Sequence, residues 1–336
     1  MNRTIASAFV GVFVFGLAQT ALSAEMPTLR YVVGGNDTSL SQLPITVART
    51  KGFFEREGLN VEFVTNDESN SAAAAEGYNP SIERGGPGDI TTVSGGFFIH
   101  SVLNGSDAVA ISSQTANPVY SLIVRPEIST FEDLRGKEIT LTAPWDTITV
   151  TTRKLLSLHG IGPADFQFRR IRNSDARLEC MQSGECAAIT AGQPHDIKAI
   201  NLGLGYHRLG ITNEVGPVVF NMEIVRREWA EENRDVVVRY LRAAAGAMRF
   251  INDPDNRVEV MRIIAEITGE PQAIVEEIMA SYEDSNLRIL PRQAELDMEG
   301  FQNLLNFVEE AGLPSESLPP AEHFVDLSFA REAGIQ

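Results

Sequence analysis

The sequence predicts an α/β fold of open sheets that ends in a helical C-terminal region. From residue 29 to residue 190, short runs rich in Val, Ile and Thr alternate with helical segments, several of which stop at glycine. From Arg226 onward the strand pattern ends, and amphipathic helical runs follow one another. Because ligands bind outside the carboxyl ends of the strands in such sheets, we expect functional residues at the strand-to-helix turns.

The expected elements follow from these patterns in chain order. Gly58 and Gly160 each end a helical run, and Ser94-Gly95-Gly96 leads from a strand into a helix. Strands are expected at 29–33, 60–65, 89–93, 108–112, 119–124, 137–142, 166–171 and 187–190. Helices are expected at 43–57, from Phe97 onward, at 148–159 and 174–183, and then at 234–252, 255–268, 272–281 and 293–311.

The segment from Ser129 to Thr147 is the most informative part of this pattern. Ser129 or Thr130 caps a short helix, Gly136 stops it, and a strand then leads into a Thr- and Asp-rich loop. A new helix opens near Ile148. A strand that ends in small hydroxylic residues at a helix N-terminus makes a pocket of free N–H groups, which suits a polar or anionic ligand.

The first 24 residues have the pattern of an export signal. Arg3 supplies a positive charge, an apolar run covers residues 5–17, and Leu22 and Ala24 take the two positions that matter for cleavage. A membrane anchor is the alternative, but a span needs about 18 or more apolar residues. No cysteine lies at the cleavage point, so we expect no lipid anchor. We expect cleavage after Ala24 and a soluble, exported, periplasmic protein.

Composition and charge narrow the class of partner. The chain is 43% hydrophobic and 22% charged, which fits a large globular protein whose length allows two domains. Its net charge of −17 makes nucleic acid a poor partner, because phosphate binding needs a basic patch. A small anionic ligand stays compatible with this charge, because local N–H dipoles can outweigh distant surface charges.

Cys180 and Cys186 are the only cysteines of the sequence. In an oxidising compartment, this close pair suggests a disulfide that closes a small loop at a helix end. Two reduced structural cysteines or a reactive thiol are the alternatives. We expect no metal site, because the nearest histidine, His195, lies outside the usual ligand spacing.

Three segments together resemble one family, the periplasmic substrate-binding proteins of the nitrate/sulfonate/taurine transport group. This group has the type II periplasmic binding protein fold and also includes binders of thiamine-pyrimidine precursors. The segments are LPITVARTKGFFEREGLNV at 43–61, GDI at 88–90, and DLRGK at 133–137 followed by LLSLHGI at 155–161. They span most of the chain in the family's order. The segment GECAA at 184–188 departs from the family's G-x-x-D-A pattern, since it has no Asp.

The resemblance implies two α/β lobes of the Venus-flytrap kind, joined by two crossover segments, that close on a ligand by hinge motion. We expect a signal peptide at 1–24, lobe I at 26–121 plus 220–336, and lobe II at 122–219. The crossovers are expected near 120–125 and 216–223, where Pro118, Pro126 and Pro217 mark the borders.

The candidate ligand site collects turns from both lobes. Gly95 and Gly96 permit close backbone approach to a ligand, and Trp145 could stack on a planar ligand or instead anchor its loop. A carboxylate at Glu223 would favour a ligand with N–H donors. Any Ser, Thr or Asp of the set could be an ordinary N-cap. The predicted ligand-binding residues are Asn36, Asp37, Thr38, Ser39, Gln42, Ser94, Gly95, Gly96, Phe97, Thr142, Trp145, Asp146, Thr147, Gln193, Asn221 and Glu223, with Thr149 and Gly192 beside them.

The resemblance implies a monomeric solute-binding protein that passes a small organic ligand to an ABC permease at the inner membrane and needs no cofactor. Hydroxyls and helix N-termini suit a sulfonate or carboxylate, while Trp145 and Phe97 suit an aromatic or heterocyclic body.

Two alternatives stay open. One is an enzyme on the same fold, similar either to the pyrimidine synthase of thiamine biosynthesis, whose cysteine-rich motif is absent here, or to an aromatic sulfinate desulfinase, which needs a cleft Cys with a neighbouring His. We expect no catalytic residue of either kind. The other alternative is a sensor subunit that binds a ligand and contacts a kinase.

Overall fold

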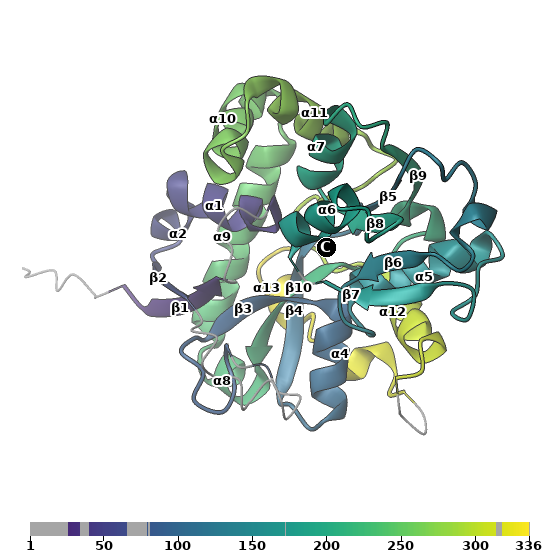
Figure 1. Cartoon of the computed structure of the whole chain (residues 1–336). Helices are drawn as coiled ribbons and strands as arrows, with labels where there is room; N and C mark the ends of the chain where they lie inside the picture. Colours follow the sequence, from purple (N-terminus) through teal and green to yellow (C-terminus); the bar gives the residue numbers. More distant parts are fainter. Residues whose placement is uncertain are drawn as a thin grey trace, which may run out of the picture.

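Figure 1 shows the computed structural model of the chain, which describes residues 26–33, 40–65, 79, 81–171, 173–313 and 318–335. Two five-stranded mixed sheets lie side by side, each with its own helices, so the predicted two-lobed α/β fold is confirmed. Within the described ranges, no helix is both long and apolar enough to cross a bilayer. The expected export signal at 1–24 lies outside the described residues.

The two sheets have the same plan. In the first, of order β2-β1-β3-β10-β4, β10 is antiparallel to both its neighbours and the other four strands all run in one direction. In the second, of order β7-β6-β8-β5-β9, β5 takes that antiparallel place. The strands are β1 Thr28–Val33, β2 Asn60–Thr65, β3 Ile90–Ser94, β4 Ala108–Thr115, β5 Ser121–Val124, β6 Glu138–Leu141, β7 Gln167–Arg170, β8 Ala188–Ala191, β9 His207–Ile211 and β10 Asn221–Arg226.

The chain passes between the sheets twice, from β4 to β5 and from β9 back to β10. The lobe limits at 26–121 plus 220–336 and 122–219 stay a prediction. The strand prediction missed β9 and assigned β10 to a crossover. In β10 the polar residues Asn221 and Glu223 are buried, so the strand lacks the apolar pattern that would mark it.

Helices cover both faces of each sheet. Tyr240 and Leu241 of α9 pack on one face of the first sheet, and Phe98 of α4 and Phe301 of α12 pack on the other. The helices include α1 Leu43–Thr50, α2 Phe53–Arg56, α4 Gly95–Leu103, α5 Thr147–Leu158, α6 Ser174–Gln182, α7 His195–Asn201, α8 Arg227–Glu232, α9 Arg234–Asn252, α10 Arg257–Thr268, α11 Gln272–Glu283, α12 Met298–Glu310 and α13 Ser328–Glu332.

Two helix predictions were wrong at specific points. The predicted helix at 43–57 is two helices, because Gly52 adopts a left-handed φ of 68° between α1 and α2. The predicted helix at 293–311 begins only at Met298, where Asp297 accepts hydrogen bonds from the backbone N–H groups of Glu299 and Gly300. The amphipathic pattern of 293–297 therefore belongs to a loop.

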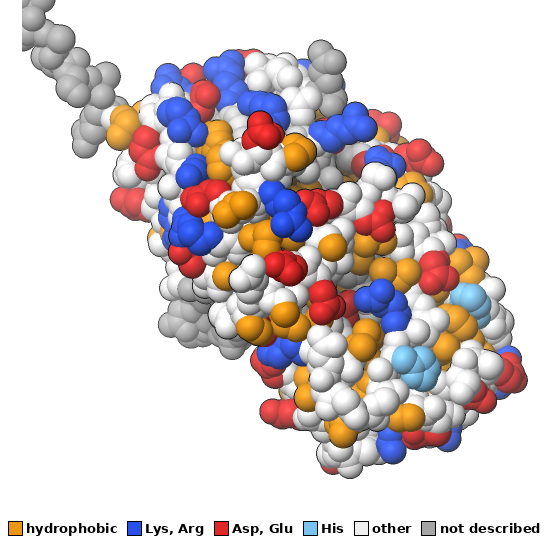
Figure 2. Space-filling model, turned by 90° about the horizontal axis from the view of Figure 1, so that it is seen from above, with side chains coloured by type: hydrophobic (Ala, Val, Ile, Leu, Met, Phe, Trp, Pro, Cys, Tyr) orange, Lys and Arg blue, Asp and Glu red, His pale blue; other side chains and the backbone are white. Residues whose placement is uncertain are grey.

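The surface carries both signs of charge. On the face seen from above in Figure 2, Lys and Arg side chains lie among Asp and Glu side chains, with hydrophobic side chains between them. Side chains of both charge signs are thus interspersed on this face. Such a surface keeps a protein soluble without creating a single strongly charged region.

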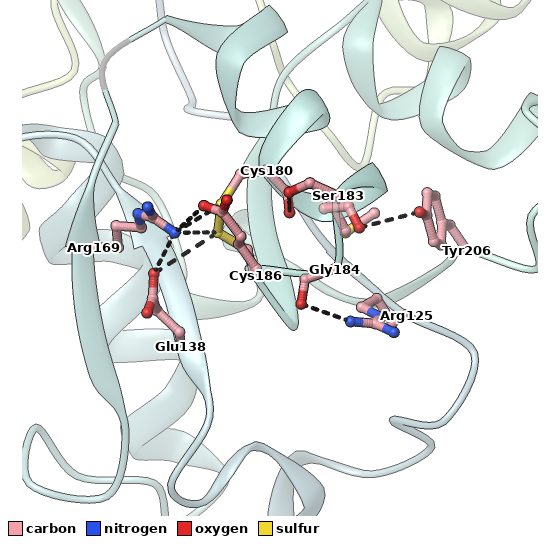
Figure 3. Close-up of a disulfide and its surroundings, with 10 residues drawn as sticks. Arg125, Glu138, Arg169, Cys180, Ser183, Gly184, Cys186 and Tyr206 are labelled. Carbon is pink, nitrogen blue, oxygen red and sulfur yellow. Dashed lines mark hydrogen bonds and ion pairs between the residues drawn. A yellow bond between two sulfur atoms is a disulfide. The ribbon is translucent and has the colours of Figure 1, made fainter.

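The predicted disulfide between Cys180 and Cys186 is present in the second lobe (Figure 3). It ties the last turn of α6 to the residues that lead into β8. Beside it, the guanidinium of Arg169 pairs with Glu138 at 3.1 Å and with Glu185 at 2.8 Å. The bridge fixes the position of α6 against the sheet that it covers.

Candidate ligand-binding site

One turn from each lobe meets its counterpart directly across the cleft. The turn from β3 into α4 carries Ser94, and the turn from β6 into α5 carries Asp146 and Thr147. The Ser94 hydroxyl donates to Asp146 Oδ1 at 2.7 Å and lies 3.0 Å from Thr147 Oγ1. The backbone N–H of Gly96 donates to Thr147 Oγ1 at 3.1 Å. These predicted site residues are therefore brought together, and they bind one another.

The two glycines of the first turn are explained by close contacts within the protein, across the cleft for Gly96 and inside the first lobe for Gly95. A Cβ on Gly96 would overlap the carbonyl oxygen of Trp145, and one on Gly95 would overlap the side chain of Leu304. The Gly95 N–H donates to the Phe220 carbonyl at 2.9 Å. The close approach that glycine permits is thus an approach to the protein itself.

Trp145 extends the same contact between the lobes. Its indole stacks on the imidazole of His100 in α4, with ring centroids 5.2 Å apart and planes at 4°. Burial lowers the pKa of His100, which keeps the ring neutral for this stacking. One face of Trp145 is therefore covered by protein, and its contact with a ligand stays a prediction. In α4, Phe98 is fully buried and Phe97 is half-buried.

A pocket of about 270 Å³ lies at the crossover end of the cleft. Asn221 lies between this pocket and the contact that Ser94 makes, because it lines the pocket and pairs with Ser94 in the β10–β3 register. The pocket draws residues from both crossovers, from the turn after β8, and from α11. It is lined by Leu40, Ser41, Thr115, Asn117, Val119, Tyr120, Gly192, Gln193, Phe220, Asn221, Tyr282 and Ile289.

The turn after β8 brings the predicted residue Gln193 into this pocket. The backbone of Gly192 packs against the ring of Tyr120, where a Cβ would overlap the ring. The carbonyl of Gly192 accepts the N–H groups of His195 at 2.9 Å and of Asp196 at 3.2 Å. These bonds satisfy the start of α7 and leave the Gln193 side chain at the pocket wall.

The remaining described candidates lie near the cleft but in closed local environments. The backbone N–H of Thr142 donates to Thr149 Oγ1 at 3.2 Å, and both residues are buried. Gln42 is 9% exposed, and its Oε1 has no hydrogen-bond donor in the described part of the chain. The candidates Asn36, Asp37, Thr38 and Ser39 lie outside the described residues.

Glu223 lies deep inside the first lobe and away from the pocket wall. It is fully buried and accepts hydrogen bonds from the Ser112 and Tyr240 hydroxyls and, at 2.6 Å, from the Gln114 amide. Burial raises the pKa of Glu223, while these three donors oppose the rise. The network fixes β10 between its neighbours. A direct role for Glu223 in ligand contact has no support from this position.

Sequence reasoning missed Tyr120, which lines the pocket, and Arg177, which is buried near it. Desolvation raises the pKa of Tyr120, the charge of Arg177 opposes the rise, and the charges of Asp146 and Asp196 add to it. Arg177, 2% exposed, extends from the interior of α6 and donates to the Ile171 carbonyl at 3.2 Å. Its position in mid-helix gives no strand-end signal.

Tyr282 was also missed. It reaches the pocket from α11, and desolvation followed by the nearby Tyr120 raises the pKa of its hydroxyl. The two tyrosines thus approach each other from different parts of the fold.

Solved structures share this architecture at low sequence identity. The alkanesulfonate-binding protein SsuA from Xanthomonas axonopodis pv. citri, bound to MOPS, aligns with a TM-score of 0.68 and 16% identity over 90% of this chain and 99% of its own. The periplasmic nitrate-binding protein NrtA from Synechocystis PCC 6803 aligns with a TM-score of 0.71 and 15% identity, over 91% and 88% of the two chains. The desulfurization enzyme DSZB aligns with a TM-score of 0.63 and 14% identity, over 91% and 98%.

These likenesses establish the fold. A search of curated proteins gives no significant match. The sequence profile described as NMT1/THI5 like matches residues 40–257, which is well over half of the chain and includes both crossovers and the pocket turns. The chain therefore belongs to the NMT1/THI5-like family.

Proposed function

We propose that the protein is an extracytoplasmic solute-binding protein that captures a small organic ligand between its lobes and delivers it to an ABC permease. The observation that carries the proposal is the pocket at the crossover end of the cleft, where both lobes supply wall residues. Asn221 comes from the first sheet, while Gln193 follows a strand of the second. A ligand in this pocket contacts both lobes and therefore stabilises their closed arrangement.

Two ion pairs support a mechanism of lobe closure. Lys154 of α5 pairs with Glu310 of α12 at 2.9 Å, and Lys198 of α7 pairs with Glu270 at 3.0 Å. Both join an element of the second lobe to an element of the first. Each surface ion pair contributes little free energy. The two pairs therefore orient the lobes as they close, and ligand binding supplies the free energy that shifts the population toward the closed form.

The relatives support this class of function. SsuA is described as binding alkanesulfonates and NrtA as binding nitrate, and both are binding proteins. The amino-terminal pattern at 1–24 agrees with export to the periplasm, where such a protein meets its ligand. A sulfonate or carboxylate, or an aromatic or heterocyclic compound, are the ligand classes that the sequence predicts.

An enzyme on the same fold is the competing function, since DSZB shares the architecture. A desulfinase of this kind needs a cysteine thiol in the cleft. Both cysteines of the sequence are joined in the disulfide on α6, which favours binding over cysteine-based catalysis.

A thermal-shift screen of the mature chain, residues 25–336, tests the proposal. The screen covers sulfonates, aromatic and aliphatic carboxylates, pyrimidines, aromatic amides and flavins, and small-angle X-ray scattering follows each hit. A compound that binds the folded chain raises its melting temperature by mass action. We expect the radius of gyration to fall on binding, or to stay unchanged where the free protein is already closed. Conversion of the compound into a different product during incubation would instead indicate an enzyme.

A further inference from the structure

Three helix starts at the cleft have their backbone N–H groups occupied by the protein itself, and this bears on the ligand that the cleft accepts. Anions in α/β clefts are held by free N–H groups at helix N-termini. Three of the helices that begin at the cleft are α4, α5 and α7. Each has protein acceptors on the N–H groups of its first residues.

At α4 the acceptors come from both lobes. The Gly95 N–H donates to the Phe220 carbonyl at 2.9 Å, and the Gly96 N–H donates to Thr147 Oγ1 at 3.1 Å. At α5 the N-cap is itself an anion. Asp146 is 7% exposed, and its carboxylate accepts the Ser94 hydroxyl at 2.7 Å and lies 3.4 Å from the Ile148 nitrogen. A ligand anion at this helix would have to displace a carboxylate.

At α7 the turn itself and the first residues of the helix supply the acceptors for the first N–H groups. The Gly192 carbonyl accepts two N–H groups, and the side chain of Asp196 accepts the N–H of Ile197 at 2.8 Å. The second oxygen of Asp196 is paired with Arg208 at 3.2 Å and with the Ser121 hydroxyl at 2.8 Å. The starts of α4, α5 and α7 therefore offer an anion no ready site.

The pocket wall adds an independent observation. None of its described lining residues carries a charge: they are amides, hydroxyls, aromatic rings and aliphatic groups. Among the charges near the wall, Asp196 is paired with Arg208 at 3.2 Å. An ion in this pocket would lose its hydration without a compensating charge.

We propose that the pocket takes an uncharged, single-ring ligand with amide-like donors and acceptors, and that Asp146 sets this specificity by excluding oxyanions. The inference rests on the proposed binding function and narrows its ligand. The pocket's 270 Å³ is slightly below the roughly 300–1,000 Å³ of drug-sized sites, which fits one ring. Tyr120 and Phe220, whose rings form an edge contact at 5.4 Å, supply the aromatic wall, and Gln193 and Asn221 supply amides that both donate and accept.

The test uses pairs of compounds that share a ring and differ in charge. These are benzamide with benzoate, nicotinamide with nicotinate, and benzenesulfonamide with benzenesulfonate, measured by calorimetry on the mature chain. We expect the uncharged member of at least one pair to bind at least about tenfold more tightly than its anion. Tighter binding of the anions, or binding of none of the six, overturns the inference. A hit elsewhere in the thermal-shift screen would leave the proposed function standing in either case.

Two variants sharpen the test. Asp146→Asn keeps an oxygen for Ser94 but removes the charge, so we expect benzoate to gain about tenfold relative to benzamide. Asp235→Asn, which changes an exposed carboxylate on α9, is the control. Asn221→Ala should weaken benzamide about tenfold, whereas Asn306→Ala on the exposed face of α12 should not. Unchanged selectivity in Asp146→Asn would remove this residue from the determinants of specificity.

Discussion

The two ends of the cleft are built from the same kind of strand-to-helix turn and do opposite things. At one end, Ser94 and Gly96 of the first lobe contact Asp146 and Thr147 of the second directly. At the other end, the turn that carries Gln193 leaves a pocket. The first end bonds across the cleft because the Ser94 hydroxyl of one turn reaches the Asp146 carboxylate of the other. The second turn satisfies its backbone locally, through the Gly192 carbonyl.

This difference shows that a hydroxyl or carboxylate at a strand end does not by itself indicate a ligand contact. What decides is whether a protein acceptor reaches the free N–H groups of a helix start when the lobes close. At α5 the expectation of free N–H groups was wrong, because Asp146 and Ser94 occupy that position. The following changes separate the two ends, from the largest expected effect to the smallest.

Gly96→Val should break the contact end. A side chain at this position overlaps the Trp145 carbonyl, and overpacking of this kind costs about 1–3 kcal/mol, or about fivefold to 140-fold in a binding constant that requires closure. Scattering should show a larger radius of gyration, with both lobes still folded by circular dichroism. Gly162→Ala is the matched control, since its nearest neighbour is the flexible Asp165 carboxylate at 3.4 Å. An unchanged radius of gyration would contradict the direct contact.

Glu223→Gln should change how the free energy of unfolding depends on pH. The variant tests β10, the strand that also carries Asn221. Burial raises the pKa of Glu223 in the folded chain above its ordinary 4.5. The stabilisation that protonated Glu223 gives the folded chain is therefore complete below about pH 4.5. This stabilisation is lost as the pH rises toward the folded-state pKa, by up to about 1.4 kcal/mol per pH unit. Urea unfolding of Glu223→Gln should show a smaller fall across this window. Equal pH slopes in the variant and the parent chain would refute the account, and exposed Glu310→Gln is the control.

Trp145→Ala should weaken closure without unfolding either lobe. The stack of Trp145 on His100 contributes about 1 kcal/mol, or about fivefold in ligand affinity. His100→Ala should cost about the same, and the double variant should cost little more than either single one. Fully additive effects would mean that the two rings act separately, for instance with Trp145 on the ligand.

Lys154→Met should have the smallest effect. The exposed pair with Glu310 contributes less than about 1 kcal/mol and is screened by salt. We expect ligand affinity in the parent chain to fall slightly between low and high salt, and the variant to lose part of that dependence. Arg239→Met is the control, because its pair with Asp235 lies within α9. A variant as salt-dependent as its parent would exclude this pair from closure.

Most elements could be predicted from the sequence, because each carries a local signal of period, cap or glycine stop. The strand β10 could not be, since Asn221 and Glu223 are buried with partners such as Ser112 and Tyr240 that are distant in the sequence. For the site, strand ends located the turns. What each turn contacts depends on how the lobes meet, and the approach of Arg177 from within a helix depends on tertiary packing, neither of which a local pattern encodes.

The most direct test of the account is a crystal structure of the mature chain with benzamide, or with whichever of the six paired compounds binds most tightly. We predict a ligand against Tyr120, Gln193 and Asn221, with the Ser94–Asp146 hydrogen bond intact beside it. A ligand oxygen placed between the Gly96 N–H and Thr147, with the two turns separated, would contradict the division of the cleft into a contact end and a binding end.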